Sequence, residues 1–312
     1  MSTNSGKSSP ELVPSVSRRC AVGVIGLGIM GSLYASHLLN TGLSVAGFDI
    51  SEDRRRQFEQ AGGALCVSAA EVVDRADVVI TALSSIAAYR SVMLGPNSVT
   101  HRAQAAQLFV EMGTLPIALK EEARESLARR GAQMIDAPVT GTRVHAERKE
   151  LVVYASGDEA AVARARPVLE AFASNIRFVG PFGSGMKLKM VTNHLVAVHN
   201  VAAAEALALA ESAGLDLKQV YDLIAGGPAS SAVFGFRGPF MIENRYEPPT
   251  MRMDVFEKDL QIIDDFARTL RAATPLFQSS TTIYRAALAQ GMKSEDVSAV
   301  FNLNSSVTPL PG

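Results

Sequence analysis

The chain has 312 residues, of which 47% are hydrophobic, and a formal net charge of −1 at pH 7. Proteins that bind nucleic acids or membrane surfaces concentrate basic side chains on one patch, and this sequence has none, so we expect neither partner. The densest basic run, Arg54, Arg55 and Arg56, is predicted to be a solvated helix face. Length and composition together predict a globular protein of two ordinary domains.

Only two cysteines are present, Cys20 and Cys66, and their spacing matches neither a metal site nor a disulfide framework. We therefore expect a reducing compartment, the cytoplasm. Residues 1–20 are rich in Ser and Pro and lack the apolar stretch of a secretory signal, so we predict a disordered tail. Glu11 and the scarcity of arginine argue against the alternative, a transit peptide. The sequence contains no run of about 18 apolar residues, so we predict no membrane-spanning helix.

The most informative segment is an apolar strand at 21–25 that leads into a GxGxxG turn and a helix. In a dinucleotide-binding fold the first glycine permits the tight turn, the second lets the backbone approach a pyrophosphate, and the third allows the helix to pack on the strand. A second predicted strand at 44–48 ends in an acidic residue about 20 residues further on, as this fingerprint requires. The predicted cofactor-binding residues in this part are Gly26, Leu27, Gly28, Ile29, Met30, Gly31 and Asp49.

Short apolar runs alternate with helical stretches up to about residue 180, which predicts an α/β fold with a doubly wound, Rossmann-like sheet over 21–184. The predicted strands are 21–25, 44–48, 78–83, 107–111, 133–136 and 151–155. Ligands of such sheets bind beyond the carboxyl ends of the strands. The loops after two of these strands are therefore candidates for the cofactor site, through Leu83, Ser84 and Thr114.

Beyond a glycine-rich hinge the pattern becomes helical. A long Ala-rich helix is predicted over 186–213, with a stop signal at Gly214. Further helices are predicted at 217–225, 253–269, 274–290 and 294–301, interrupted by a Gly/Pro-rich segment at 226–249. We thus predict an all-helical domain over 185–312, which the long helix joins to the sheet domain. This helical domain is expected to expose a long apolar face that subunits would share, so we expect a homodimer or homotetramer.

Two polar residues of the long helix are candidates for catalysis. Lys189 and Asn193 lie four residues apart and so share one face, which Asn200 extends, whereas Lys187 points elsewhere. Their neighbours are apolar, and buried polar groups need partners or a purpose. A lysine desolvated between two domains has a lowered pKa and can exchange a proton with a substrate oxygen, as a carbonyl/alcohol redox reaction at a nicotinamide requires. The alternative is a surface lysine at the start of a helix.

A turn rich in hydroxyl groups follows the predicted strand at 133–136. Backbone N–H groups and the hydroxyls of Thr140 and Thr142, with Gly141 between them, can hold a carboxylate, although taken alone the segment is a simple turn. The five histidines show no metal-ligand spacing, and no metal is expected.

Five motifs, GLGIMG, DAPVTG, GSGMKLKMVTN, FEKDL and GMKSEDVSAV, occur in this order between residues 21 and 301. Together they resemble the β-hydroxyacid dehydrogenase family. The resemblance implies that Lys189 donates or accepts the proton of the reaction with Asn193 as its companion. It also implies a substrate carboxylate at Thr140, Gly141 and Thr142, and further substrate or cofactor contacts at Met251, Asp259, Thr114 and Lys258.

The chain departs from the family at several of these positions. Thr140 replaces the usual serine, Arg143 and His145 stand where relatives are richer in glycine, and Met251 stands where phenylalanine is frequent. Because a hydroxyl is retained at Thr140, the resemblance still implies carboxylate binding. The added bulk and charge after it leave the identity of the substrate open.

The resemblance implies an NAD(P)-dependent dehydrogenase of small 3-hydroxy acids, or a reductase of the corresponding semialdehydes, of the 3-hydroxyisobutyrate or 2-hydroxy-3-oxopropionate type. An L-threonate-type acid-sugar dehydrogenase is one alternative. An imine reductase and a non-catalytic dinucleotide-sensing protein are the others, and the presence of Lys189 speaks against both. NAD is the expected cofactor because Asp49 would repel a 2′-phosphate, while Arg54, Arg55 and Arg56 keep NADP open.

Overall fold

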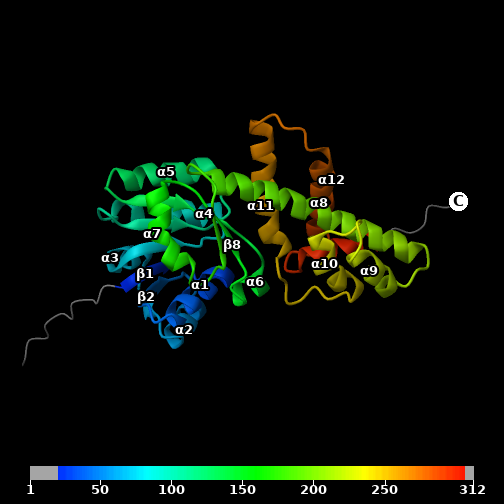
Figure 1. Ribbon diagram of the computed structural model, residues 1–312, viewed down its shortest axis with the longest axis horizontal. Helices are drawn as coiled ribbons and strands as arrows, with labels where there is room; N and C mark the ends of the chain where they lie inside the picture. The colour runs from blue at the N-terminus through cyan, green and yellow to red at the C-terminus, as the bar shows by residue number, and fades with distance from the viewer. Residues whose placement is uncertain (1–19, 306–312) are drawn as a thin grey trace, which may run out of the picture.

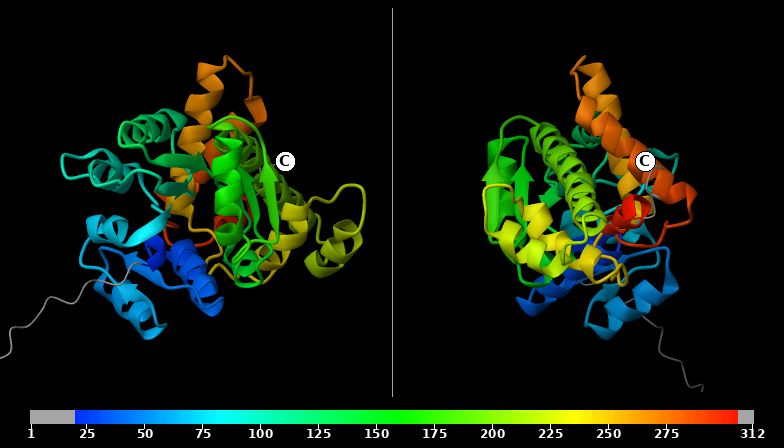
Figure 2. Two further views of the ribbon diagram at one scale, coloured as in Figure 1. Left: turned by 60° about the vertical axis from the view of Figure 1, so that its left-hand side comes forward. Right: turned by 90° about the vertical axis from the view of Figure 1, so that its right-hand side faces the viewer.

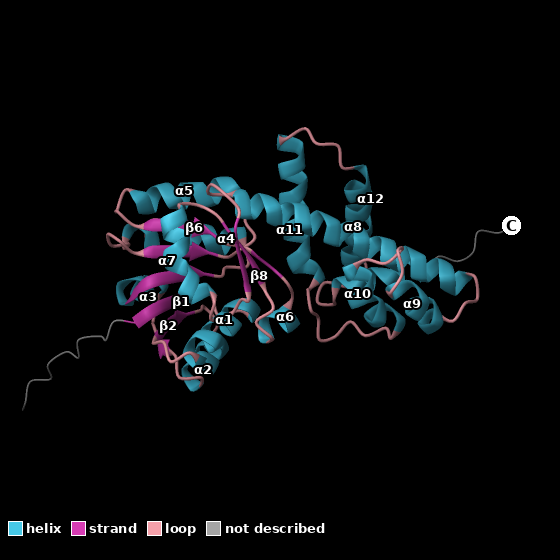
Figure 3. Cartoon of the chain, viewed as in Figure 1, coloured by secondary structure: helices cyan, strands magenta, loops and turns pink. Residues whose placement is uncertain are grey.

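The computed structural model describes residues 20–305. Its strands gather at one end of the molecule, and the other end is built from helices (Figure 3). One long helix, α8 (Ser184–Ser212), runs from the sheet into the helical end (Figure 1). Of the tail expected at 1–20, Cys20 instead begins the first strand, and residues 1–19 lie outside the described part of the chain.

The main sheet has six parallel strands in the order β3-β2-β1-β4-β5-β6, so the predicted Rossmann-like topology is confirmed. The order reverses between β1 and β4, which is where ligands of such sheets bind. The bounds of the strands are β1 (Cys20–Ile25), β2 (Val45–Phe48), β3 (Ala64–Leu65), β4 (Ala76–Thr81), β5 (Leu108–Glu111) and β6 (Gln133–Asp136).

Helices cover both faces of this sheet, which explains why its central strands are largely apolar. Buried side chains of α1 and α7 pack on one face, and those of α3, α4 and α5 on the other. A π-helical turn at Arg90–Leu94 and a 3-10 turn at Val99–His101 link α4 to β5. The helices are α1 (Ile29–Asn40), α2 (Glu52–Gln60), α3 (Ala69–Arg75), α4 (Ile86–Tyr89), α5 (Ile117–Ala128) and α7 (Glu159–Leu169).

A second, three-stranded sheet packs against α8. It contains β7 (Val139–Thr140), β8 (Val152–Ala155) and β9 (Asn175–Phe178), and the short helix α6 (Arg143–Glu147) lies between β7 and β8. The strand expected at 151–155 therefore does not extend the parallel sheet. The chain turns back at Gly141, so β8 pairs antiparallel with β7 and meets β6 only through an antiparallel bridge between Asp136 and Ser156.

The helical end is built around α8, against which α10, α11 and α12 pack. Helices α11 and α12 lie side by side as an antiparallel pair (Figure 2). The single helix expected at 294–301 is instead a 3-10 turn at Val297–Val300 followed by α13. The helices are α9 (Leu217–Ala225), α10 (Ala232–Ile242), α11 (Met253–Thr269), α12 (Pro275–Ala289) and α13 (Phe301–Ser305).

Helix α10 corrects the prediction of an interrupting Gly/Pro-rich segment at 226–249. Ser231 caps its start by accepting a hydrogen bond from the Phe234 N–H at 3.0 Å. Pro239 cannot donate to the carbonyl of Gly235 four residues earlier, and the Tyr221 hydroxyl on α9 donates to that oxygen instead, at 2.8 Å. The helix thus forms because a neighbouring helix supplies the missing donor.

By length and composition, α8 is the one helix within residues 20–305 that would be able to cross a membrane. Its buried face packs on α10, α11 and α12, and it carries Lys187 and Glu205 on its exposed positions. The helix is therefore the central packing element of the helical end.

Candidate active site

The glycine turn after β1 has the shape of a phosphate cradle. Gly26 has φ +93°, and a Cβ on Gly31 would lie 1.9 Å from the Gly26 carbonyl oxygen, so α1 packs directly on the turn. A Cβ on Gly28 would meet no atom within 4 Å. Helix α1 begins at this glycine without a side-chain cap, which leaves its first N–H groups directed at the open space. The residues present therefore fit the pyrophosphate of a dinucleotide.

Asp49, at the end of β2, braces this turn. Its Oδ2 accepts the Leu27 N–H at 2.7 Å and its Oδ1 accepts the Ser51 N–H at 2.8 Å. The neighbouring arginines are on α2: Arg55 lies over the Phe48 ring, 5.9 Å from its centroid, and Arg56 pairs with Asp53.

The two strand-end loops singled out in the sequence lie beside the cradle. Leu83 contacts two of the glycines. A Cβ on Gly26 would lie 3.3 Å from Leu83 Cδ2, and a Cβ on Gly113 would lie 3.0 Å from the Leu83 carbonyl oxygen. Ser84 is exposed. The carbonyl of Thr114 accepts a hydrogen bond from Lys258 Nζ, so the loop after β5 is tied to α11 in the helical end.

Lys189 and Asn193 lie on the buried face of α8, against α11. Asn193 Nδ2 donates to Asp259 Oδ2 at 3.0 Å, and Lys258 Nζ is 2.8 Å from Asp259 Oδ1. Within residues 20–305, no side chain or carbonyl accepts a hydrogen bond from Lys189 Nζ. One continuous chain of polar contacts thus runs from Asn193 through Asp259 and Lys258 to Thr114.

This environment changes the acidity of Lys189. The side chain is 7% exposed, and burial lowers its pKa to about 8, an effect that the negative charge of Asp259 opposes and the positive charge of Lys258 reinforces. An amine with this pKa is present in both protonation states near neutral pH and can serve as either acid or base.

The turn at 140–142 is shaped by a residue that sequence reasoning did not assign to the site. His145 Nδ1 accepts the Thr142 N–H at 3.1 Å and lies 2.9 Å from the Thr142 hydroxyl. Gly141 has φ +129°, and its Cβ would lie 2.7 Å from Leu151 Cδ2. The His145 ring is 5.9 Å from that of Phe236 on α10. A histidine three residues after a threonine acts here as the second half of a capping box, where Glu or Gln is usual.

Met251 is held in the helical end, two residues before α11. Its N–H donates to Asp296 Oδ2 at 3.1 Å. The same buried carboxylate accepts hydrogen bonds from Thr250, from Ser298 and from Arg237 Nη1 at 2.9 Å. No hydrogen bond or ring contact among residues 20–305 joins Met251 to Lys189.

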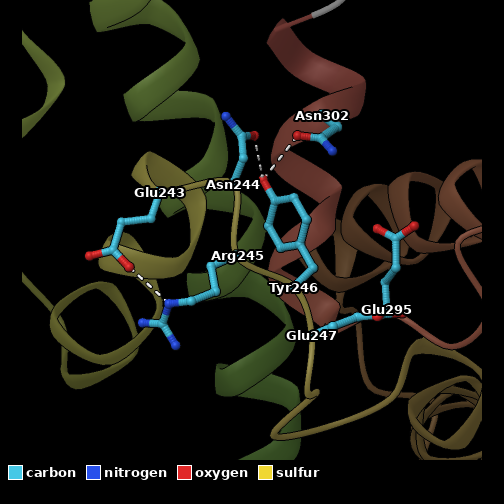
Figure 4. A pocket seen from close by; sticks show the side chains of 7 residues that line it. All are labelled: Glu243, Asn244, Arg245, Tyr246, Glu247, Glu295 and Asn302. Atoms are coloured by element: carbon cyan, nitrogen blue, oxygen red, sulfur yellow. Dashed lines mark hydrogen bonds and ion pairs between the residues drawn. The ribbon is translucent and has the colours of Figure 1, made fainter.

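Other polar groups lie outside this arrangement. His194 stacks on Phe277 at 5.0 Å between ring centroids, and His37 contacts the Ala146 carbonyl. No three His, Cys, Asp or Glu side chains in the described part of the chain gather as metal ligands would. A surface depression at the far end holds none of the residues above (Figure 4). It is lined by Glu243, Asn244, Arg245, Tyr246, Glu247, Glu295 and Asn302.

Family models match both halves of the chain. Residues 21–180 match the family model described as the NAD binding domain of 6-phosphogluconate dehydrogenase, and residues 183–304 match the NAD-binding model of NADP-dependent 3-hydroxyisobutyrate dehydrogenase. An L-threonate dehydrogenase of Cupriavidus necator is 34% identical over 93% of this chain and 98% of its own length.

Two solved structures share the fold over nearly their whole length. The 3-hydroxyisobutyrate dehydrogenase from Salmonella typhimurium has a TM-score of 0.83 at 33% identity, covering 91% of this chain and 99% of its own. The 3-hydroxyisobutyrate dehydrogenase of Mycobacterium tuberculosis, solved with L-serine, has a TM-score of 0.81 at 30% identity with the same coverage.

Proposed function

The chain belongs to the β-hydroxyacid dehydrogenase family, and on this premise we propose that Lys189 exchanges the proton with the substrate oxygen during the redox reaction. The family resemblance and the NAD(P)-dependent dehydrogenase function expected from the sequence are confirmed by these matches. When bound, the nicotinamide accepts or supplies the hydride. The chain's own residues bind and orient the substrate and move its proton.

The observation that carries this proposal is the buried amine of Lys189 beside the Asn193–Asp259–Lys258 chain of contacts. Burial makes the neutral amine accessible, and Asp259 limits the loss of the protonated form. Asn193 donates a hydrogen bond to the Asp259 carboxylate, and Lys258 forms an ion pair with it. The ammonium is then free to donate to a carbonyl oxygen, and the amine to accept from an alcohol.

We propose that the substrate carboxylate is held at the turn of residues 140–142. The Thr140 hydroxyl and the Gly141 N–H are the donors assigned to it. The Thr142 N–H is directed to His145, so Thr142 acts by shaping the turn. Met251 and Asp259 are assigned to the substrate side, with Met251 as a wall and Asp259 beside the reacting oxygen.

An acid sugar of the L-threonate type is the proposed substrate, because curated relatives of that name are 30% to 34% identical over more than nine-tenths of this chain. A 3-hydroxyisobutyrate-type acid or its semialdehyde is the second candidate. It is favoured by the two similar solved structures that carry the 3-hydroxyisobutyrate dehydrogenase name.

For the cofactor we propose NAD. The Asp49 carboxylate stands at the end of β2 with both oxygens fixed by backbone N–H groups, and its charge would repel a ribose 2′-phosphate. The proposed contacts also include the backbone of the turn at 26–31, Leu83 and Ser84, Thr114, and Lys258.

We further propose a homodimer or homotetramer in the cytoplasm. Leu188, Val191 and Leu195 leave an apolar stripe of α8 exposed by 38%, 55% and 49%, which a second copy would cover. The cytoplasm is proposed because the chain has only two cysteines and their spacing matches no disulfide framework, as is typical of a reducing compartment.

A substrate panel tests the proposed function. L-Threonate, 3-hydroxyisobutyrate, tartronate semialdehyde and a cyclic imine would each be incubated with either cofactor while the absorbance of the reduced nicotinamide is followed. Turnover of a hydroxy acid or semialdehyde supports the proposal. Turnover of the imine alone, or cofactor binding without any turnover, would replace it with one of the two other functions considered for this fold.

A further inference from the structure

The first turn of α8 is capped by side chains from the sheets. The N-cap residue Gly183 has no side chain and has φ +86°. The Gly185 N–H donates to Ser156 Oγ at 2.9 Å, and the Met186 N–H donates to Asp136 Oδ2 at 2.8 Å. Two of the N–H groups that a helix leaves without internal partners are therefore bound by residues at the ends of β6 and β8.

Asp136 is itself fixed from several sides. Lys120 Nζ on α5 is 2.7 Å from Asp136 Oδ1, and both side chains are fully buried. Ser156 Oγ lies 3.2 Å from Asp136 Oδ2 and 3.1 Å from the Asp136 carbonyl oxygen. A buried ion pair adds little net stability because desolvation offsets the attraction, so its main effect here is to hold one geometry.

The backbone of α8 also touches the segment that leads to the 140–142 turn. A Cβ on Gly185 would lie 2.2 Å from the Tyr154 carbonyl oxygen, 3.0 Å from Pro138 Cδ and 3.1 Å from the Asp136 carbonyl oxygen. Lys189 is four residues after Gly185 and three after Met186, so it lies on the same face of the helix about 6 Å further along.

Asp136 therefore has two connections. Along the chain it begins the segment that ends, four residues later, at Thr140. Through space its carboxylate caps the helix that carries Lys189. One side chain thus links the residue assigned to the substrate carboxylate with the residue assigned to the substrate oxygen.

We propose that Asp136 and Ser156 are positioning residues that set the distance between the turn at 140–142 and the Lys189 amine, and so select acids whose reacting carbon stands at one fixed separation from the carboxylate. The selectivity part rests on the proposed function. The anchoring part does not, because it concerns only the position and environment of Lys189.

Two changes test the anchor. Ser156→Ala removes the acceptor for the Gly185 N–H without leaving a charge unpaired. The double variant Asp136→Ala with Lys120→Met removes the buried pair together with the acceptor of the Met186 N–H. The buried Glu111 carboxyl then loses the Lys120 charge that lowers its pKa and takes up a proton, so that it stays neutral. The matched control is Asp216→Ala, which removes the cap that accepts the Gln219 N–H at 2.7 Å on α9, another helix of the helical end.

The first readout needs no substrate. Competitive acetylation with acetic anhydride across pH, followed by mass spectrometry, reports the pKa of Lys189, and hydrogen exchange reports the opening of Gly185 and Met186. We expect both anchor variants to raise the pKa of Lys189 from about 8 towards that of an exposed lysine and to speed exchange at the two amides. Asp216→Ala should lower the melting temperature and change neither.

The second readout is kcat/KM for two hydroxy acids that differ by one carbon between carboxylate and hydroxyl. A misplacement on the scale of 1 Å costs roughly a hundredfold, so we expect a loss of this order for the preferred acid and a smaller ratio between the two acids. Unchanged acetylation and exchange in both anchor variants would overturn the anchor, whatever their melting temperatures. If the unmodified protein turns over neither acid, the proposed function fails, while acetylation and exchange still decide the anchor.

Discussion

Asn193 on α8 and Asp259 on α11 are 66 residues apart in the chain and are joined by a hydrogen bond of 3.0 Å. This bond fixes the carboxylate whose charge acts on Lys189, one turn earlier on α8. The proton-transfer group is therefore assembled from two helices, and each of its members can be tested separately.

Replacing Lys189 by alanine removes the proposed acid/base. We expect kcat to fall by about 10²- to 10⁴-fold, the usual contribution of a positioned proton donor, while the dissociation constant of the dinucleotide stays the same. Lys187→Ala is the matched control because Lys187 is exposed on another side of the helix. Equal turnover in the Lys189 variant and the control would exclude this lysine from the chemistry.

The pH dependence should differ between the two directions of the reaction. Oxidation needs the neutral amine, so kcat/KM for the alcohol should rise with pH through about 8. Reduction needs the ammonium and should fall as pH rises through the same value. Because Asp259 raises the pKa of Lys189 and Lys258 lowers it, Asp259→Asn should move the inflection to lower pH and Lys258→Met to higher pH. Shifts in the same direction would contradict this electrostatic account.

Two glycines of the cradle should respond differently to alanine. In Gly28→Ala the new Cβ meets no protein atom, so the melting temperature should not change. The same Cβ occupies space assigned to the pyrophosphate. Loss of one phosphate contact weakens dinucleotide binding by about tenfold or more, measurable by calorimetry. In Gly31→Ala the Cβ collides with the Gly26 carbonyl, and we expect a loss of about 1–3 kcal/mol in the free energy of unfolding. Normal binding by Gly28→Ala would remove this turn from the cofactor site.

Asp49→Asn tests the choice of cofactor. Removing the charge should raise the relative kcat/KM for NADP, because an amide does not repel a 2′-phosphate. The control is Asp53→Asn, which neutralises an exposed acidic residue on the neighbouring helix. If the ratio of NAD to NADP activity is the same in all three proteins, Asp49 does not discriminate between the cofactors.

The parts of this structure that short-range patterns govern were predictable. The GxGxxG turn, the alternation of strands with helices and the shared face of Lys189 and Asn193 follow from local spacing. The contact of Asp259 with Asn193 does not, because only the family resemblance linked residues so far apart. Helix α10 was missed since Pro239 argues against a helix, and the hydroxyl that compensates for it belongs to Tyr221 on another helix.

The cap on α8 was hidden for a similar reason. A capping residue is normally found directly before the helix, but the residue at that position of α8 is Gly183, which has no side chain. The atoms that bind its first turn come from Asp136 and Ser156, some 50 and 29 residues earlier than the N–H groups they accept. In the sequence His145 stands out only for its added bulk and charge, because a histidine is an unusual partner for a threonine cap.

The buried carboxylate of Asp296 has a consequence for how the molecule is made. It gathers Arg237, Thr250 and Ser298 around one charge, so the interior of the helical end is incomplete until residues 296–298 have been synthesised. The main sheet uses only residues up to 136 and can form while the ribosome is still translating the helices. Until α10, α11 and α12 have been synthesised, the apolar side of α8 lacks its intramolecular cover, and this is the stage at which a nascent chain would most need protection from aggregation.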